Sequence, residues 1–117
     1  MTKYANIYQR FLNLANALDQ LTEFPQLSPD EKFLMLQLNN YWIKNQEVKV
    51  VEVIKSIKES SPATVFRNLK KLRLKGYVEL RVDEEDNRVK YIKPTNLTIS
   101  YFDAHGKIIL KTAKLGA

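Results

Sequence analysis

The 117-residue sequence contains no cysteine and only one histidine. The lack of cysteine excludes a disulfide scaffold, a thiolate metal site, a cysteine nucleophile and a thiol redox sensor. A single histidine also excludes a metal site built from several imidazoles, and we expect no cofactor. No nucleophile is paired with a base, so we expect no enzyme. Glycine and proline are sparse, at three and four residues, so most of the chain can form regular structure.

Long apolar runs are also absent. None approaches the ~18 residues of a membrane-spanning helix, so we expect no membrane partner. The N-terminal segment MTKYANIYQR lacks an apolar stretch with a small-residue cleavage site. We therefore expect no secretory signal and a cytoplasmic protein. With 44% apolar and 27% charged residues, the composition is that of a soluble globular protein.

Positive charge is concentrated in the middle of the chain. Residues 1–47 carry four basic and five acidic side chains, residues 48–95 carry twelve and seven, and residues 96–117 carry three and one. These segments contribute −1, +5 and +2 to the formal net charge of +6. A basic middle segment favours a surface that binds a polyanion. A solvated lysine-rich surface is the alternative.

Two helices are predicted before the basic segment. Over residues 3–22, apolar side chains at spacings of three and four form two neighbouring stripes. A helix with so much apolar girth packs against several neighbours, within its own domain or on another subunit. A second helix begins at Pro29, with Ser28 as N-cap and Glu31 completing a capping box. It should fade at residues 44–46. Its buried stripe consists of Leu34, Leu38, Tyr41 and Trp42.

The basic segment predicts a short strand at 48–50 and a short helix at 51–58. After a serine turn, Ser61 is the N-cap of a helix at 62–75. This helix stops at Gly76, which can adopt the left-handed conformation.

Strands at 77–82 and 88–93 follow, joined by a polar turn and closed by a proline. A final helix covers 96–115 and is weakened at His105 and Gly106, where we interpret the histidine as a surface position. Two helices, a short turn and a hairpin describe a winged helix-turn-helix. The predicted fold is therefore mainly α with a small β-hairpin wing (α+β). One domain spans 1–117, with an N-terminal arm at 1–25, a core at 28–95 and a C-terminal helix at 96–117; the terminal helices serve dimerisation.

The helix at 62–75 has an apolar side and a basic side. Val65, Leu69 and Leu72 anchor it, while Arg67 and Lys71 lie near the opposite side. Such a face suits the major groove of DNA, although a solvated amphipathic helix has the same pattern. The preceding turn and following hairpin favour DNA. The predicted DNA contacts are Ser61, Thr64, Arg67, Asn68, Lys70, Lys71 and Lys75 around this helix, and Asn87, Arg88 and Lys90 on the wing.

The hairpin tip carries four consecutive acids, Asp83 to Asp86. They lack the alternating ligands of a calcium loop, and no base accompanies them for carboxylate catalysis. We interpret them electrostatically: Asp83 or Asp86 braces Arg88 or a lysine at the hairpin base. An arginine held in one direction suits insertion into a narrow minor groove.

The segment from Thr64 to Thr95 resembles the MarR family of winged-helix transcriptional regulators. The family pattern T-V-x-R-x-L-x-x-L-x-x-x-G is matched from Thr64 to Gly76, and the wing pattern D-x-x-D-x-R is matched by Asp83, Asp86 and Arg88. The resemblance implies that Arg67 contacts DNA and that an aspartate orients Arg88. Departures from the family are Phe66, where a small polar residue is common, Pro94 and Thr98, and a single helix after the wing.

The sequence therefore predicts a homodimeric, sequence-specific transcriptional regulator that binds double-stranded DNA. One alternative is a winged helix that binds a protein partner through the wing and Phe66. The other is a DNA-binding protein of the plasmid replication initiator type. No feature of the sequence supports a small-molecule effector.

Overall fold

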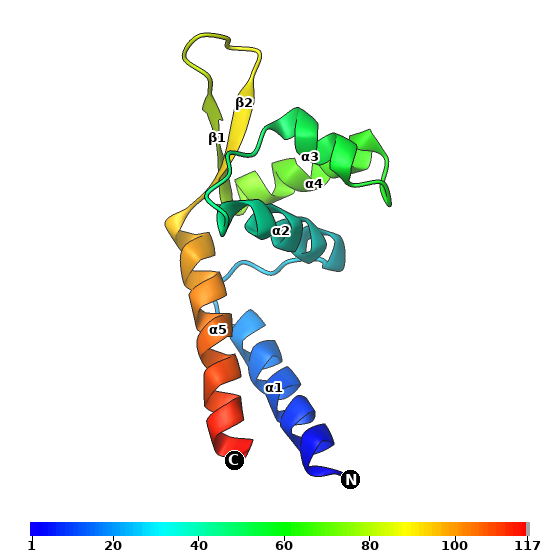
Figure 1. Ribbon diagram of the computed structural model, residues 1–117, viewed down its shortest axis with the longest axis vertical. Helices are drawn as coiled ribbons and strands as arrows, with labels where there is room; N and C mark the ends of the chain where they lie inside the picture. Colours follow the sequence, from blue (N-terminus) through cyan, green and yellow to red (C-terminus); the bar gives the residue numbers. More distant parts are fainter. Residues whose placement is uncertain (117) are drawn as a thin grey trace. The chain divides into compact units, whose positions relative to one another are not determined.

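The computed structural model describes residues 1–116, with side chains through Lys114; the predicted C-terminal segment extends one residue further, to Ala117, outside this range. The chain forms two compact units, one from residues 1–26 with the segment from Leu97 onward, the other from Leu27–Asn96. In chain order the elements are α1 (Lys3–Asp19), α2 (Pro29–Trp42), α3 (Val50–Ser56), α4 (Pro62–Leu74), β1 (Val78–Val82), β2 (Lys90–Pro94) and α5 (Asn96–Gly116) (Figure 1). None of the helices within residues 1–116 is long and apolar enough to cross a membrane.

Helix α1 ends three residues before the predicted boundary. Thr2 caps its start by accepting a hydrogen bond from the Ala5 backbone N–H at 3.1 Å. The chain then leaves the helix after Asp19 and turns, so that Phe24 is buried. The Phe24 ring packs edge-on against Tyr101 of α5, with centroids 5.6 Å apart.

Helix α5 is continuous through His105 and Gly106, so the predicted weakening there is wrong. His105 Nδ1 lies 2.7 Å from the Tyr101 carbonyl oxygen, and its ring lies 4.2 Å from the Tyr101 ring. His105 Nε2 lies 3.4 Å from Asp19 Oδ1 of α1, and its side chain is only 22% exposed. The histidine is therefore a packing residue between α1 and α5. One glycine costs a helix only about 1 kcal/mol relative to alanine, which this packing offsets.

Helix α2 begins as predicted. The Ser28 N–H donates to Glu31 Oε1 at 3.0 Å and the Glu31 N–H donates to Ser28 Oγ at 3.2 Å, which confirms the capping box. Leu34 and Leu38 are buried, as predicted for the stripe. Tyr41 and Trp42 are half-buried, and the buried stripe also contains Met35.

The strand predicted at 48–50 is wrong. Lys49 forms only an isolated bridge with Tyr91, and the Ile92 N–H donates to the Val48 carbonyl at 2.8 Å. Val50 already opens α3, which places Val53 in the core at 1% exposure. The helix therefore begins at the last residue of the predicted strand.

Helix α4 and the hairpin complete the second unit. The Thr64 N–H donates to Ser61 Oγ at 3.2 Å, confirming the N-cap. Gly76 has a φ of 87°, the left-handed conformation predicted for it. Strands β1 and β2 pair antiparallel, from Val78 opposite Pro94 to Val82 opposite Lys90. The second strand therefore starts two residues later than predicted and includes Pro94. In Figure 1 the hairpin extends away from α3 and α4 of the same unit.

Candidate nucleic-acid interface

One side of helix α4 is buried in the core. The other side exposes basic side chains, here called the cationic front, which are Arg67, Lys70, Lys71 and Arg73. Val65, Leu69 and Leu72 are 2%, 4% and 0% exposed, and the helix packs on α2 and α3. These contacts confirm the predicted anchoring side. On the remaining surface Thr64 is half-buried, whereas the exposed predicted contacts are Ser61, Arg67, Lys70 and Lys71. Arg73, which was not among the predicted contacts, is exposed as well.

Asn68 does not belong to this front. Its side chain is only 8% exposed and lines a small hollow with Leu34, Ile57 and Val65. Residue 68 follows Val65 by three positions and precedes Leu72 by four, so helical geometry places all three on one face. Asn68 therefore lies on the buried side of α4, which does not favour its predicted role as a DNA contact.

Lys75 also points inward. Its Nζ lies 2.8 Å from both carboxylate oxygens of Glu31, whose side chain is only 3% exposed. Burial would raise the pKa of Glu31, but hydrogen bonds from Lys75 and Ser28, together with the lysine charge, lower it. The Lys75 charge compensates a buried carboxylate and is not part of the cationic front. The sequence does contain a signal for this ion pair. Glu31 precedes Leu34 by three residues and Leu38 by seven, so it lies on the same buried face of α2 and needs a cation as partner.

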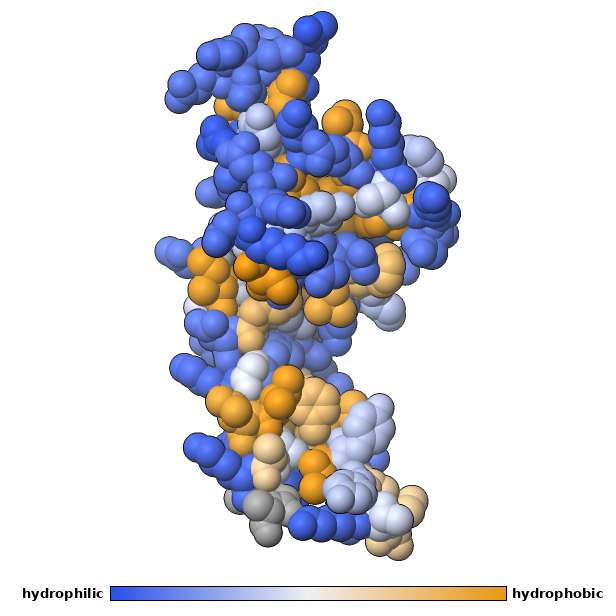
Figure 2. Space-filling view, in the orientation of Figure 1, coloured by the Kyte–Doolittle hydropathy of each residue, from blue (hydrophilic) through white to orange (hydrophobic). Residues whose placement is uncertain are grey.

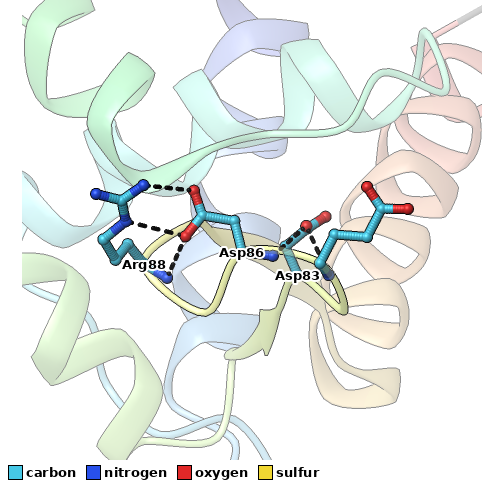
Figure 3. Close-up of polar contacts among 4 residues, drawn as sticks. Asp83, Asp86 and Arg88 are labelled. Atoms are coloured by element: carbon cyan, nitrogen blue, oxygen red, sulfur yellow. Dashed lines mark hydrogen bonds and ion pairs between the residues drawn. The ribbon is translucent and has the colours of Figure 1, made fainter.

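The wing arginine is braced by Asp86. Arg88 Nε donates to Asp86 Oδ1 at 3.0 Å and its Nη2 donates to Oδ2 at 3.2 Å (Figure 3). The Arg88 backbone N–H donates to the same Oδ1 at 3.1 Å. These hydrogen bonds lower the pKa of Asp86. The Arg88 side chain is nevertheless 88% exposed, so the brace orients a guanidinium that remains accessible.

Asp83 shapes the tip. Its Oδ2 accepts the backbone N–H groups of Glu85 and Asp86 at 3.1 and 3.0 Å (Figure 3). Its Oδ1 accepts the Tyr91 hydroxyl at 3.3 Å. Burial, followed by the Asp83 charge and this hydrogen bond, raises the pKa of Tyr91. Of the two candidate aspartates, Asp86 contacts the Arg88 guanidinium and Asp83 holds the turn. Asn87 and Lys90 are exposed beside them.

A further ion pair at the hairpin base was not predicted. Arg81 Nη2 lies 2.9 Å from Glu47 Oε1, and its guanidinium carbon lies 4.8 Å from the Tyr91 ring centre. Lys93 approaches the same glutamate at 3.8 Å. These contacts occupy cations that sequence alone would count toward a binding surface.

Several solved structures share this fold. The YusO protein from Bacillus subtilis is 16% identical, with a TM-score of 0.59, and the match covers 95% of this chain and 70% of that one. The S. aureus MepR–DNA complex is 18% identical, with a TM-score of 0.64 and coverages of 96% and 82%. The heme sensor protein PefR from Streptococcus agalactiae, in complex with heme, is 17% identical, with a TM-score of 0.60 and coverages of 92% and 69%. No protein-family model and no curated protein matches the chain.

These structural neighbours are MarR-family proteins. The fold predicted from the recognition-helix and wing motifs is therefore confirmed: residues 1–116 form a winged helix-turn-helix with flanking helices, like those proteins. At 16–18% identity the likeness concerns the fold.

Proposed function

We propose that the protein is a sequence-specific transcriptional regulator that binds double-stranded DNA. The observation that carries this proposal is the cationic front of α4 together with the braced, 88% exposed Arg88 of the wing in the same compact unit. The fold is similar to that of MepR in its complex with DNA, which supports the DNA-binding function. In this proposal the protein acts in the cytoplasm by occupying a DNA site and catalyses no reaction.

Each part of the interface has its own task. Helix α4 is presented for the major groove, where Arg67 can make a two-pronged contact with guanine. Lys70 and Lys71 neutralise phosphates, which adds affinity without sequence information. Arg88 is directed at the adjacent minor groove, where width and potential dominate recognition.

The proposal includes a homodimer formed through α1 and α5. Helix α1 contains no buried residue, although it is apolar around much of its girth. An apolar groove of about 380 Å³ between the two helices is lined by Tyr4, Ile7, Tyr8, Phe11, Ile109, Thr112 and Ala113. Figure 2 shows hydrophobic residues gathered on this unit. A second copy of the chain, related by a two-fold axis, would bury this apolar face, and two-fold dimers are the commonest oligomers.

Titration with duplex DNA at several salt concentrations tests the DNA-binding function. We expect log affinity to fall linearly with log salt, because phosphate contacts release counterions. Arg67→Ala should weaken binding, whereas Lys111→Ala, which removes the same charge from α5, should not. An affinity for DNA that is absent or insensitive to salt would refute the proposal and favour a protein-binding winged helix.

Sedimentation at micromolar concentration tests the dimer separately. We expect a species of twice the 13.7 kDa chain mass. A monomer under these conditions would contradict the assembly and leave the DNA-binding proposal to be judged by the titration.

A further inference from the structure

Phe66 is an exposed aromatic residue next to the basic side chains of α4. It is the fifth residue of α4, directly before Arg67, and 56% of it is exposed. Exposing a phenylalanine forgoes much of the stabilisation that burial provides. The proposed contacts of α4 with phosphates and guanine make no use of this ring. Phe66 therefore needs an explanation beyond the general DNA-binding function.

The surroundings of Phe66 combine apolar and cationic groups. A hollow of about 270 Å³ lies between α4, the start of α3 and the hairpin. Its apolar lining consists of Val50, Phe66, Leu69 and Leu80, and its cations are Lys70, Arg73 and Lys90. This surface fits a partner that presents a small apolar group between negative charges.

Duplex DNA has that chemistry in the major groove. Thymine presents its C5-methyl group there, and apolar side chains including phenylalanine contact it. The phosphates on either side complement the three cations. The N-terminal part of a recognition helix makes the base-edge contacts, and Phe66 lies in that part of α4.

We propose that Phe66 is a specificity residue that contacts the methyl group of a thymine beside the base pair read by Arg67. The inference rests on the proposed DNA-binding function and deepens it, because it assigns a base preference to a particular side chain. Burial of one methyl group corresponds to about a fourfold change in affinity. We therefore expect a modest preference at one position of each half-site.

The experiment uses a duplex recovered by selection from a random pool with the full chain. Each thymine of a half-site is replaced in turn by deoxyuridine, which removes only the C5-methyl group. We expect about a fourfold loss of affinity per half-site at one position. With Phe66→Ala this loss should disappear, while the salt dependence stays that of the parent. With Phe66→Leu, which keeps an apolar contact, part of the methyl effect should remain.

Leu74→Ala is the matched control, because Leu74 is also exposed on α4, at 74%, but ends the helix. It should leave the methyl effect unchanged. Thermal unfolding of each variant checks folding. The inference is overturned if no thymine shows a methyl effect, or if Phe66→Ala retains the effect in full. In either case salt-dependent binding by the parent would leave the DNA-binding function intact, whereas failure of the parent to bind any duplex would remove both.

Discussion

The Lys75 ammonium lies 2.8 Å from the carboxylate of Glu31 and joins the C-terminal end of α4 to the first turn of α2, across 44 residues of sequence. The carboxylate also completes the capping box of α2 with Ser28. The buried Glu31 side chain therefore both links α4 to α2 and caps the N-terminus of α2. Through it, the orientation of the proposed recognition helix is tied to the core of its unit.

Replacing Lys75 by methionine should destabilise the fold. The substitution leaves the Glu31 carboxylate buried without its cation, and an uncompensated buried polar group costs about 1–3 kcal/mol. Urea unfolding at pH 7 measures the change. Lys71→Met, at an exposed position one turn earlier, should have little effect on the free energy of unfolding. Equal stability of the two variants would show that the ion pair contributes nothing.

The same pair predicts sensitivity to acid. The pKa of Glu31 is lowered in the folded state from an ordinary value of 4.5. The unfolded chain therefore takes up this proton first, and the stabilisation is present above pH 4.5 and is lost as the pH falls through the lowered pKa. Glu31→Gln should be less stable than the parent near neutral pH, and the two stabilities should converge in acid. The exposed Glu84→Gln serves as control, and parallel curves for Glu31→Gln and the parent would contradict the assignment.

Arg67→Ala should cost DNA affinity at one base position per half-site. Loss of a two-pronged contact to guanine corresponds to about 1–3 kcal/mol and relaxes the preference at that position. Binding isotherms on a selected and a scrambled duplex measure this. Since Arg67 is exposed, thermal unfolding should hardly change. Unaltered binding to both duplexes would remove α4 from the interface.

Asp86→Ala provides a test in which two explanations predict opposite signs. If net charge alone mattered, removing an acid would strengthen DNA binding. Because Asp86 orients the Arg88 guanidinium through two side-chain hydrogen bonds, we expect weaker binding instead. Arg88→Ala should weaken binding to most sequences alike and reduce the salt slope by about one phosphate-equivalent per wing. Glu84→Ala, a neighbouring acid, should not weaken binding, and tighter binding by Asp86→Ala would refute the brace.

Features that depend on residues close in sequence could be predicted. The Ser28 capping box, the Ser61 cap and the left-handed Gly76 each involve groups within about one helical turn. The Asp86 brace of Arg88 spans two residues. For these features the chain's own stereochemistry already limits the choices to a few, so local pattern is sufficient.

Features that depend on packing could not be predicted. Asn68 and Lys75 look like members of a basic helix face. Asn68 is instead buried in the core, and the Lys75 side chain turns inward to pair with the carboxylate of Glu31, which is distant in sequence. His105 looks like a helix breaker until Tyr101 and Asp19 are placed around it. The sequence by itself determined the winged-helix pattern and its capped, glycine-terminated recognition helix. Only the tertiary structure decided which cations remain accessible, because partners far apart in the chain are brought within ion-pair distance solely by the packing of the core.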